Sequence, residues 1–322
     1  MTFIHEDLQF PSLLEIVQGD LAKKGLQMTL ALVEKDYWVT HTLWALHHLG
    51  LEVWFKGGTS LSKGFGLIQR FSEDLDLKIE GGRQVLPEVT SWKSGKPGSI
   101  AKRLEFFEAI AKLNLPELDL QLDPGSLGEK CMGAGIEARY PGLHIADLEP
   151  SMKPFVLLEV GEARVKPFLE RPLSSFVHDF LETTGQLETY LDNRPERVRC
   201  IHPMVTLIEK LDAIQKRFNR GDDPADFVRH YEDAAHIILR SRDLPELPEY
   251  GSPVLLLQDM LSMRQIRQAP SPDDPAFNPD PGLQWKDIEA THAAIGGMFW
   301  GERIDLKEAN QAIRNWMLAN PV

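Results

Sequence analysis

Asp74 and Asp76 are separated by one residue in the segment "RFSEDLDL" (70–77). Because successive side chains of a strand alternate between its faces, a strand here would project both carboxylates from one face, with α-carbons about 6.5–7 Å apart. Carboxylates at this spacing can bind one or two divalent cations, and Mg²⁺ commonly bridges carboxylates to substrate phosphates. The alternative is an acidic strand face that is turned to solvent. We predict a metal site at these two aspartates.

A glycine-rich turn with hydroxyl side chains precedes the aspartates, in the segment "FKGGTSLSK" (55–63). Glycine permits positive φ and leaves neighbouring main-chain N–H groups accessible to an anion. The order of residues differs from a Walker A loop, since Gly64 rather than Ser or Thr follows the lysine. The residues expected to contact the phosphates of a nucleotide are Lys56, Gly57, Gly58, Thr59, Ser60 and Lys63.

The turn and the aspartates require a strand, a turn, a helix and a second strand in succession. The β-rich run 51–56 ends at two glycines, residues 59–70 have helical spacing, and residues 74–79 alternate between apolar and charged. Two later segments, 135–140 and 154–165, also indicate strands, and the connection between them favours antiparallel pairing.

Helical spacing predominates in the rest of the chain. We therefore predict the α+β class: a mixed or antiparallel sheet with helices in residues 1–173, followed by a helical domain in residues 174–322. A loop rich in proline and aspartate interrupts the later helices at 269–282. The predicted helices are 10–24, 28–48, 59–70, 100–113, 174–192, 203–219, 225–240, 252–268, 286–297 and 306–318.

The charge and the cysteine content restrict the possible classes of function. The 322 residues carry a formal net charge of −13, which disfavours general coating of nucleic acid. The two cysteines form no CxxC pair, and the N-terminal residues lack the basic and apolar regions of a signal peptide. No apolar run approaches the roughly 20 residues of a membrane helix. We expect a cytoplasmic protein without a membrane partner.

The strand, the glycine-hydroxyl turn, the helix and the DxD strand together resemble the signature of the DNA polymerase β-like nucleotidyltransferase superfamily. Within it, "EKDYW" (34–38), "FKGGTSLSK" (55–63) and "RFSEDLDL" (70–77) resemble the AbiEii/AbiGii toxin family. The members are nucleotidyltransferases of bacterial toxin–antitoxin and phage-defence (abortive-infection) systems. The resemblance resumes in 156–161 and 206–238, and the spacing from turn to aspartates is slightly longer than the usual pattern.

The resemblance implies three further site residues. Glu159 would be a third carboxylate beside the aspartates, although a solvent-facing position on an edge strand also fits it. Lys210 would contact the phosphates of the nucleotide, with an exposed helix lysine as the alternative. Asp233 would take part in activity, although "RHYEDAA" departs from the family's segment at this place. The alternative for Asp233 is an i,i+4 pair with Arg229.

These residues and the resemblance predict a metal-dependent nucleotidyltransferase. It would use Mg²⁺ or Mn²⁺ and an NTP, and the resemblance implies a tRNA 3′ end or a protein side chain as acceptor. The resemblance also implies a toxin whose antitoxin is encoded by an adjacent gene. A kinase-like phosphotransferase on the same fold and a catalytically silent nucleotide-binding regulator stay open; a DxD glycosyltransferase would leave the turn unexplained. The best local basic patch is "RPERVR" (194–199), either for RNA or as a solvated segment.

Overall fold

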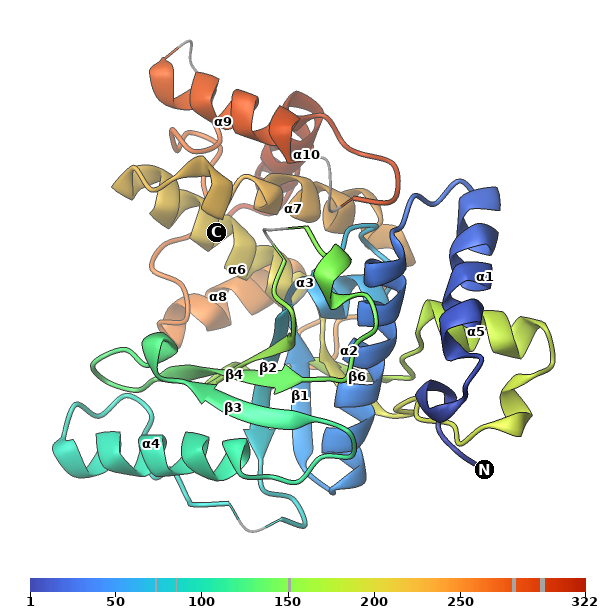
Figure 1. The fold of residues 1–322 in the computed structure, drawn as a ribbon. Helices are drawn as coiled ribbons and strands as arrows, with labels where there is room; N and C mark the ends of the chain where they lie inside the picture. Colours follow the sequence, from blue (N-terminus) through green and yellow to red (C-terminus); the bar gives the residue numbers. More distant parts are fainter. Residues whose placement is uncertain (73, 85, 150–151, 280–281, 296–298) are drawn as a thin grey trace. The chain divides into compact units, whose positions relative to one another are not determined.

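The computed structural model describes the 322 residues except 73, 85, 150–151, 280–281 and 296–298 (Figure 1). The chain forms two compact units. The boundary expected near residue 173 falls within the first unit, between β6 (Phe168–Arg171) and α5 (Phe176–Thr183). The first unit comprises Met1–Gly64, Phe71–Val165 and Leu169–Cys200, and the second comprises Phe65–Arg70, Lys166–Phe168 and Ile201–Val322.

A mixed sheet of seven strands is the core of the first unit, with the strand order β3-β4-β5-β2-β1-β7-β6. In its middle, β2 (Asp74–Glu80) pairs antiparallel with β1 (Glu52–Lys56) and parallel with β5 (Val156–Gly161). The other strands are β3 (Asp119–Asp123), β4 (Gly133–Arg139), β7 (Val198–Ile201) and β6. The antiparallel pairing predicted for 135–140 and 154–165 is confirmed by β4 and β5.

The alternation predicted for residues 74–79 is confirmed in β2. Leu75, Leu77 and Ile79 are buried, whereas the polar residues between them are half-buried. On the apolar side of the unit, α2 (Leu30–His48) packs against β1, β5, α1 (Phe10–Lys23) and α5. Because α2 has neighbours on several sides, it is buried along most of its length.

The helix expected over 59–70 is shorter and less regular than predicted. A single helical turn, α3 (Gly57–Thr59), continues into a π-helical turn at Ser60–Gly64 and stops there. Gly66 has a φ of +60°, in the left-handed region, which is incompatible with a continuing right-handed helix. Residues 65–72 therefore contain no helix.

The remaining elements of the first unit match the prediction in part. The helix expected over 100–113 is α4 (Pro97–Ala111), which packs on β3 (Figure 1). The helix expected over 174–192 ends at Thr183, because Gly185 follows with a φ of +69°, a conformation typical of helix ends. The short strands β3, β6 and β7 were not predicted.

The second unit is helical, which confirms the expected α+β class with a helical C-terminal part. The helix α7 (Arg229–Leu239) packs against both α6 (Pro203–Arg220) and α10 (Leu306–Ala319). Two further helices are α8 (Pro253–Ser262) and α9 (Leu283–Ala294). The end of the helix predicted over 286–297 lies partly outside the described residues. Among the residues that the structure describes, no helix is long and apolar enough to cross a membrane.

Candidate functional site

One row of residues crosses five strands of the sheet in the first unit. Lys56 of β1 lies opposite Asp76 of β2, and Asp76 lies opposite Glu159 of β5. Glu159 lies opposite Gly135 of β4, which in turn lies opposite Asp123 of β3. Directly opposed residues of paired strands share one face of the sheet. The register therefore places a lysine and three carboxylates on the same face, with a glycine between two of the acids.

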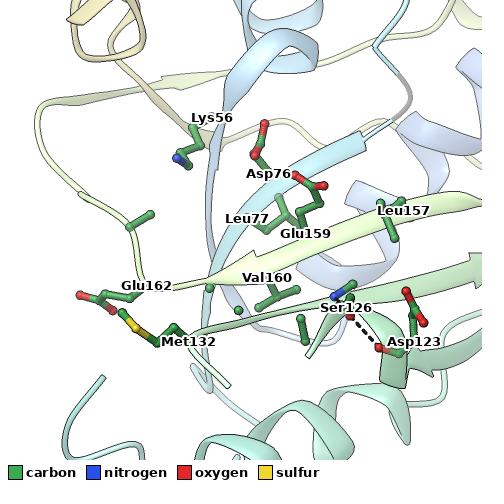
Figure 2. A pocket seen from close by; sticks show the side chains of 15 residues that line it. Lys56, Asp76, Leu77, Asp123, Ser126, Met132, Leu157, Glu159, Val160 and Glu162 are labelled. Atoms are coloured by element: carbon green, nitrogen blue, oxygen red, sulfur yellow. Dashed lines mark hydrogen bonds between the residues drawn. The ribbon is translucent and has the colours of Figure 1, made fainter. Parts of the chain in front are cut away.

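A cavity of about 390 Å³ lies over this row. Gly135 keeps its floor open, because a β-carbon there would stand 3.3 Å from the side chain of Ser126. Figure 2 shows Lys56, Asp76 and Glu159 close together on one side of this cavity. The cavity therefore has a charged side, and small residues leave room beside it for a bound molecule.

The conformation of Gly57 lets the glycine turn approach Asp76. Its φ is +77°, in the left-handed region that side chains rarely adopt. A β-carbon at this position would overlap Asp76 Oδ2 and stand 2.8 Å from Asp76 Cγ. The carboxylate of Asp76 thus lies directly against the main chain of the turn. The two elements that the sequence singled out are brought together here.

The hydroxyl groups of Thr59 and Ser60 face the protein interior. Thr59 Oγ1 lies 2.7 Å from the carbonyl oxygen of Ser72 and 2.8 Å from that of Asp74, so it donates to the chain at the start of β2. Ser60 is buried as well. In this structure the Thr59 hydroxyl holds the turn against the start of β2, and the predicted contact of Thr59 and Ser60 with phosphates stays a prediction.

Lys63 also has a different position from the one expected. Its ammonium forms an ion pair of 2.6 Å with Asp36 of α2 and donates to the carbonyl oxygen of Ser174 at 2.8 Å and to Thr40 Oγ1 at 3.1 Å. An ammonium can donate three hydrogen bonds, and three oxygens of the protein accept them here. In this structure Lys63 therefore anchors the π-helical turn to α2, and its expected role at the phosphates stays a prediction.

Glu159 combines contact with solvent and an unusual acidity. Its side chain is exposed at the cavity, yet protein atoms surround the carboxylate on its other sides. This desolvation, together with the negative charges of Asp76 and Asp74, raises the pKa of Glu159 to about 7, although Lys153 opposes the shift. A hydrogen bond also joins the Glu159 and Asp76 side chains. The positive charge near the two carboxylates does not balance their negative charges, and a bound cation would do so.

Asp74 is engaged by a lysine that the sequence did not indicate. Lys153 Nζ lies 3.0 Å from Asp74 Oδ1. Within the described residues, no group of three or more His, Cys, Asp and Glu side chains is placed to hold a metal ion by itself. The protein therefore offers the contacting pair Asp76 and Glu159, with Asp74 next to them on the same strand face.

Lys210 and Asp233 lie together in the second unit, in a buried ion network. Asp233 is completely buried, and its two oxygens accept from Arg70 Nε and Nη2, both at 2.8 Å, and from Lys210 Nζ at 2.7 Å. Burial alone would raise the pKa of Asp233, but the charges of Arg70 and Lys210 outweigh it and lower that pKa strongly. A carboxylate held in this way is a poor proton acceptor.

The expected roles of Lys210 and Asp233 at the nucleotide stay predictions, and the structure shows the two side chains in contact with each other. The ammonium of Lys210 is committed to Asp233 and lies 3.4 Å from His230 Nδ1. The surface pair between Asp233 and Arg229 is replaced by this buried network. Within its unit, the network attaches the segment Phe65–Arg70 to α6 and α7.

The basic segment 194–199 is matched by acids of the same unit. Arg194 pairs with Asp192 and Glu182, and Arg197 pairs with Glu170. Because these partners neutralise the arginines, the segment is a weak anchor for a phosphate backbone.

The sequence did not reveal that the charged residues of "EKDYW" bind main-chain groups in the protein interior. Glu34, Lys35 and Asp36 are consecutive and buried in an otherwise largely apolar helix. Glu34 accepts from the main-chain nitrogens of residues 143 and 144, and Asp36 accepts from that of residue 176 besides binding Lys63. Three adjacent charges in an apolar helix were the signal, because buried charges require partners.

Both a protein family and a solved structure resemble this chain. Residues 42–294 match the family described as "Nucleotidyl transferase AbiEii toxin, Type IV TA system". No curated protein matches the chain. Among solved structures, the chain is similar to MenT4, a nucleotidyltransferase toxin from Mycobacterium tuberculosis H37Rv, at 14% sequence identity over 93% of both chains, with a TM-score of 0.39. Since the family match spans most of its length, the chain belongs to the nucleotidyltransferase AbiEii toxin family of type IV toxin–antitoxin systems.

Proposed function

We propose that the protein transfers a nucleotide from an NTP to a hydroxyl of an acceptor, with a divalent metal ion, at the face formed by Lys56, Asp76 and Glu159. The close contact between Gly57 and Asp76 carries this proposal. It puts the main chain of a glycine turn, which suits phosphate oxygens, against a carboxylate, which suits the counter-ion of those phosphates.

The residues present fit Mg²⁺ or Mn²⁺. Mg²⁺ usually binds one or two carboxylates and completes its shell with water and substrate phosphates. Asp76 and Glu159 supply such a pair, and Asp74 lies within reach along the strand. When bound, the metal ion would neutralise phosphate charge during transfer. The raised pKa of Glu159 reflects repulsion between the two contacting carboxylates. A bound cation would reduce this repulsion.

The chain's own residues would orient the reactants. The main chain of Gly57 and Gly58 and the ammonium of Lys56 would hold the β- and γ-phosphates. The acceptor oxygen attacks the α-phosphorus, a new P–O bond forms, and the bond to the pyrophosphate leaving group breaks. The carboxylates of the site would help to orient and deprotonate the acceptor hydroxyl.

Membership of the family supports a proposal for the acceptor and the partners. We propose that the acceptor is a tRNA 3′ end or a protein side chain, and that an antitoxin from an adjacent gene controls the protein. The net charge of −13 favours recognition of one end of an RNA over coating of its length.

The test uses Asp76→Asn, which keeps the shape of the side chain and removes its charge. Purified protein is incubated with NTPs labelled at the α- or the γ-phosphate, with MgCl₂ and with total tRNA or cell protein as acceptor. We expect α-label on the acceptor with wild type, and a loss of roughly 10³-fold or more with the variant, because a ligand to the reacting centre is removed.

Two outcomes would contradict the proposal. Transfer of γ-label instead of α-label would assign the protein a kinase-like reaction. Full activity of a folded Asp76→Asn protein, with an unchanged unfolding midpoint, would remove Asp76 from the site.

A further inference from the structure

Lys153 lies at the edge of the proposed site, and the function proposed above does not use it. Its Nζ is 3.0 Å from Asp74 Oδ1. The exposed fraction of the side chain is 38% for Lys153 and 28% for Asp74, so both reach solvent. A positive charge that solvent can reach thus lies beside an oxygen that is available to a metal ion.

A second lysine, Lys35, holds the main chain of Lys153 in place. Lys35, in α2, is completely buried, and its Nζ donates to the carbonyl oxygen of Lys153 at 2.5 Å. An ammonium is costly to bury unless polar groups of the protein replace its water. Its charge therefore serves to hold this loop, while the side chain of Lys153 extends from the fixed carbonyl to Asp74.

A cation on Asp74 would displace the ammonium of Lys153. Two positive charges cannot share one carboxylate oxygen without strong repulsion at such short range. The ammonium would turn from Asp74 toward the negative charge that arrives with the cation, which is the triphosphate. Since the carbonyl is held by Lys35, the side chain can make this change without moving the loop.

We propose that Lys153 is a substrate-binding residue that exchanges Asp74 for the phosphates of the NTP, and that Lys35 is the positioning residue that fixes it. This inference rests on the proposed function. Lys153 would act as a flexible point charge, the usual way in which lysine meets phosphate.

The first test measures nucleotide binding rather than turnover. The dissociation constants of ATP, CTP, GTP and UTP are determined by calorimetry, once with MgCl₂ and once in EDTA, for wild type, Lys153→Met and Lys153→Arg. The matched control is Lys102→Met, an exposed lysine of α4 with the same loss of charge. For the nucleotide that wild type binds, Lys153→Met should weaken binding roughly 10- to 100-fold in MgCl₂, as expected for a lost charged hydrogen bond. In EDTA the loss should be much smaller, because no cation displaces the ammonium from Asp74.

The control and the conservative variant separate a specific contact from a general charge effect. Lys153→Arg should restore most of the affinity, and Lys102→Met should bind as wild type does. In turnover assays, KM for the NTP should rise with Lys153→Met while kcat changes little, because the residue binds the substrate without touching the reacting bond.

The second test links Lys35 to Lys153. Lys35→Met should weaken NTP binding, and the double variant should bind no worse than Lys153→Met alone, because Lys35 acts through Lys153. If Lys35→Met does not fold, the Lys153 variants decide the outcome.

Affinity of Lys153→Met within twofold of the Lys102→Met control in MgCl₂ would overturn the inference and leave the proposed function intact. Additive losses in the double variant would overturn the role of Lys35. A wild-type protein that neither binds nor transfers any of the four nucleotides would overturn the proposed function itself, and this inference with it.

Discussion

The α-carbon of Gly57 lies so close to the Asp76 carboxylate that any β-carbon at position 57 would overlap Asp76 Oδ2. The turn and the acidic strand therefore meet only because residue 57 is glycine. Its φ of +77° adds a second reason for this residue type. Contact and conformation can be separated by comparing two glycine substitutions.

Gly57→Ala should reduce transfer activity by roughly 100-fold or more, because the reacting groups would be displaced by about 1 Å. The matched control is Gly25→Ala. Gly25 has a similar φ of +80° but nothing within 4 Å of the position of a β-carbon. Both variants should lose about 1–2 kcal/mol of unfolding free energy from the left-handed backbone. Equal activity of the two variants would show that the contact with Asp76 is unimportant.

Glu159→Gln should stabilise the metal-free protein at pH 8 and not at pH 4. The pKa of Glu159 in the folded protein, about 7, lies above the ordinary value of 4.5. Ionisation of this carboxyl therefore lowers the stability of the wild-type fold as pH rises between these two values. Because solvent reaches Glu159, we expect only about 1 kcal/mol. Urea unfolding in EDTA measures the difference. A variant that is no more stable than wild type at pH 8 would contradict the strained pair of carboxylates.

Divalent cation should reverse this order. MgCl₂ or MnCl₂ should raise the unfolding midpoint of wild type more than that of Glu159→Gln, because the variant lacks one charged ligand. CaCl₂ and NaCl at matched ionic strength serve as controls for screening.

Asp233→Asn should act mainly on stability. The substitution leaves Arg70 and Lys210 buried with one charge fewer to balance them, which costs about 3–5 kcal/mol. Asp226→Asn, at an exposed acid of the same unit, should change stability by less than about 0.5 kcal/mol. Urea unfolding compares the two. A fully stable but inactive Asp233→Asn would support a direct chemical role for this aspartate.

Asp36 and Lys63 should be coupled in both stability and activity. Asp36→Asn and Lys63→Met each remove one partner of a buried ion pair that anchors the turn to α2. In a double-mutant cycle, the loss in the double variant should fall short of the sum by about 1–3 kcal/mol. The cycle is measured by urea unfolding and by kcat/KM. Additive losses would mean that the pair does not transmit the position of α2 to the turn.

Acid should destabilise the protein through a buried histidine network in the first unit. Burial lowers the pKa of His5 to about 3 and, for His41 and His178, to about 4, from an ordinary value of 6.5. Tyr37 and Asn193 link the three rings through hydrogen bonds.

The folded state therefore excludes protons that the unfolded chain accepts. Stability should fall as pH drops from 6.5 to 4, by up to about 1.4 kcal/mol per pH unit for each histidine. His178→Gln keeps an amide donor for Asn193 and should reduce the slope. Unfolding free energies that stay flat from pH 6.5 to 4.5 would contradict this account.

The sequence was most informative where a pattern had one physical cause. The alternation in residues 74–79 predicted which face of β2 is buried, and the segments 135–140 and 154–165 predicted an antiparallel pair. Short strands escaped notice because four or five residues carry little periodicity. β3 has alternating leucines at 120 and 122, a signal that could have been read.

Individual site residues were harder to assign, because their roles depend on partners far away in the sequence. Lys63 and Thr59 have side chains that suit phosphate, yet their protons go to Asp36 and to main-chain oxygens. Asp233 has the charge of a catalytic acid, yet Arg70 lies 163 positions away in sequence and neutralises it. Residue type and spacing report what a side chain can do, and the tertiary fold decides which partner it has.

The path of the chain constrains how this protein can be divided. After the turn at Gly64 the chain enters the helical unit for Phe65–Arg70 and only then returns to form β2. The loop that joins the two halves of the proposed site is thus fastened by Arg70 to Asp233, a residue near the middle of the C-terminal half. A truncation after Cys200 would remove that fastening and release the loop, so neither half of the protein is expected to be autonomous. A ligand or partner that destabilises the helical unit would therefore affect the proposed site through the segment Phe65–Arg70, which belongs to that unit and directly follows the turn in the chain.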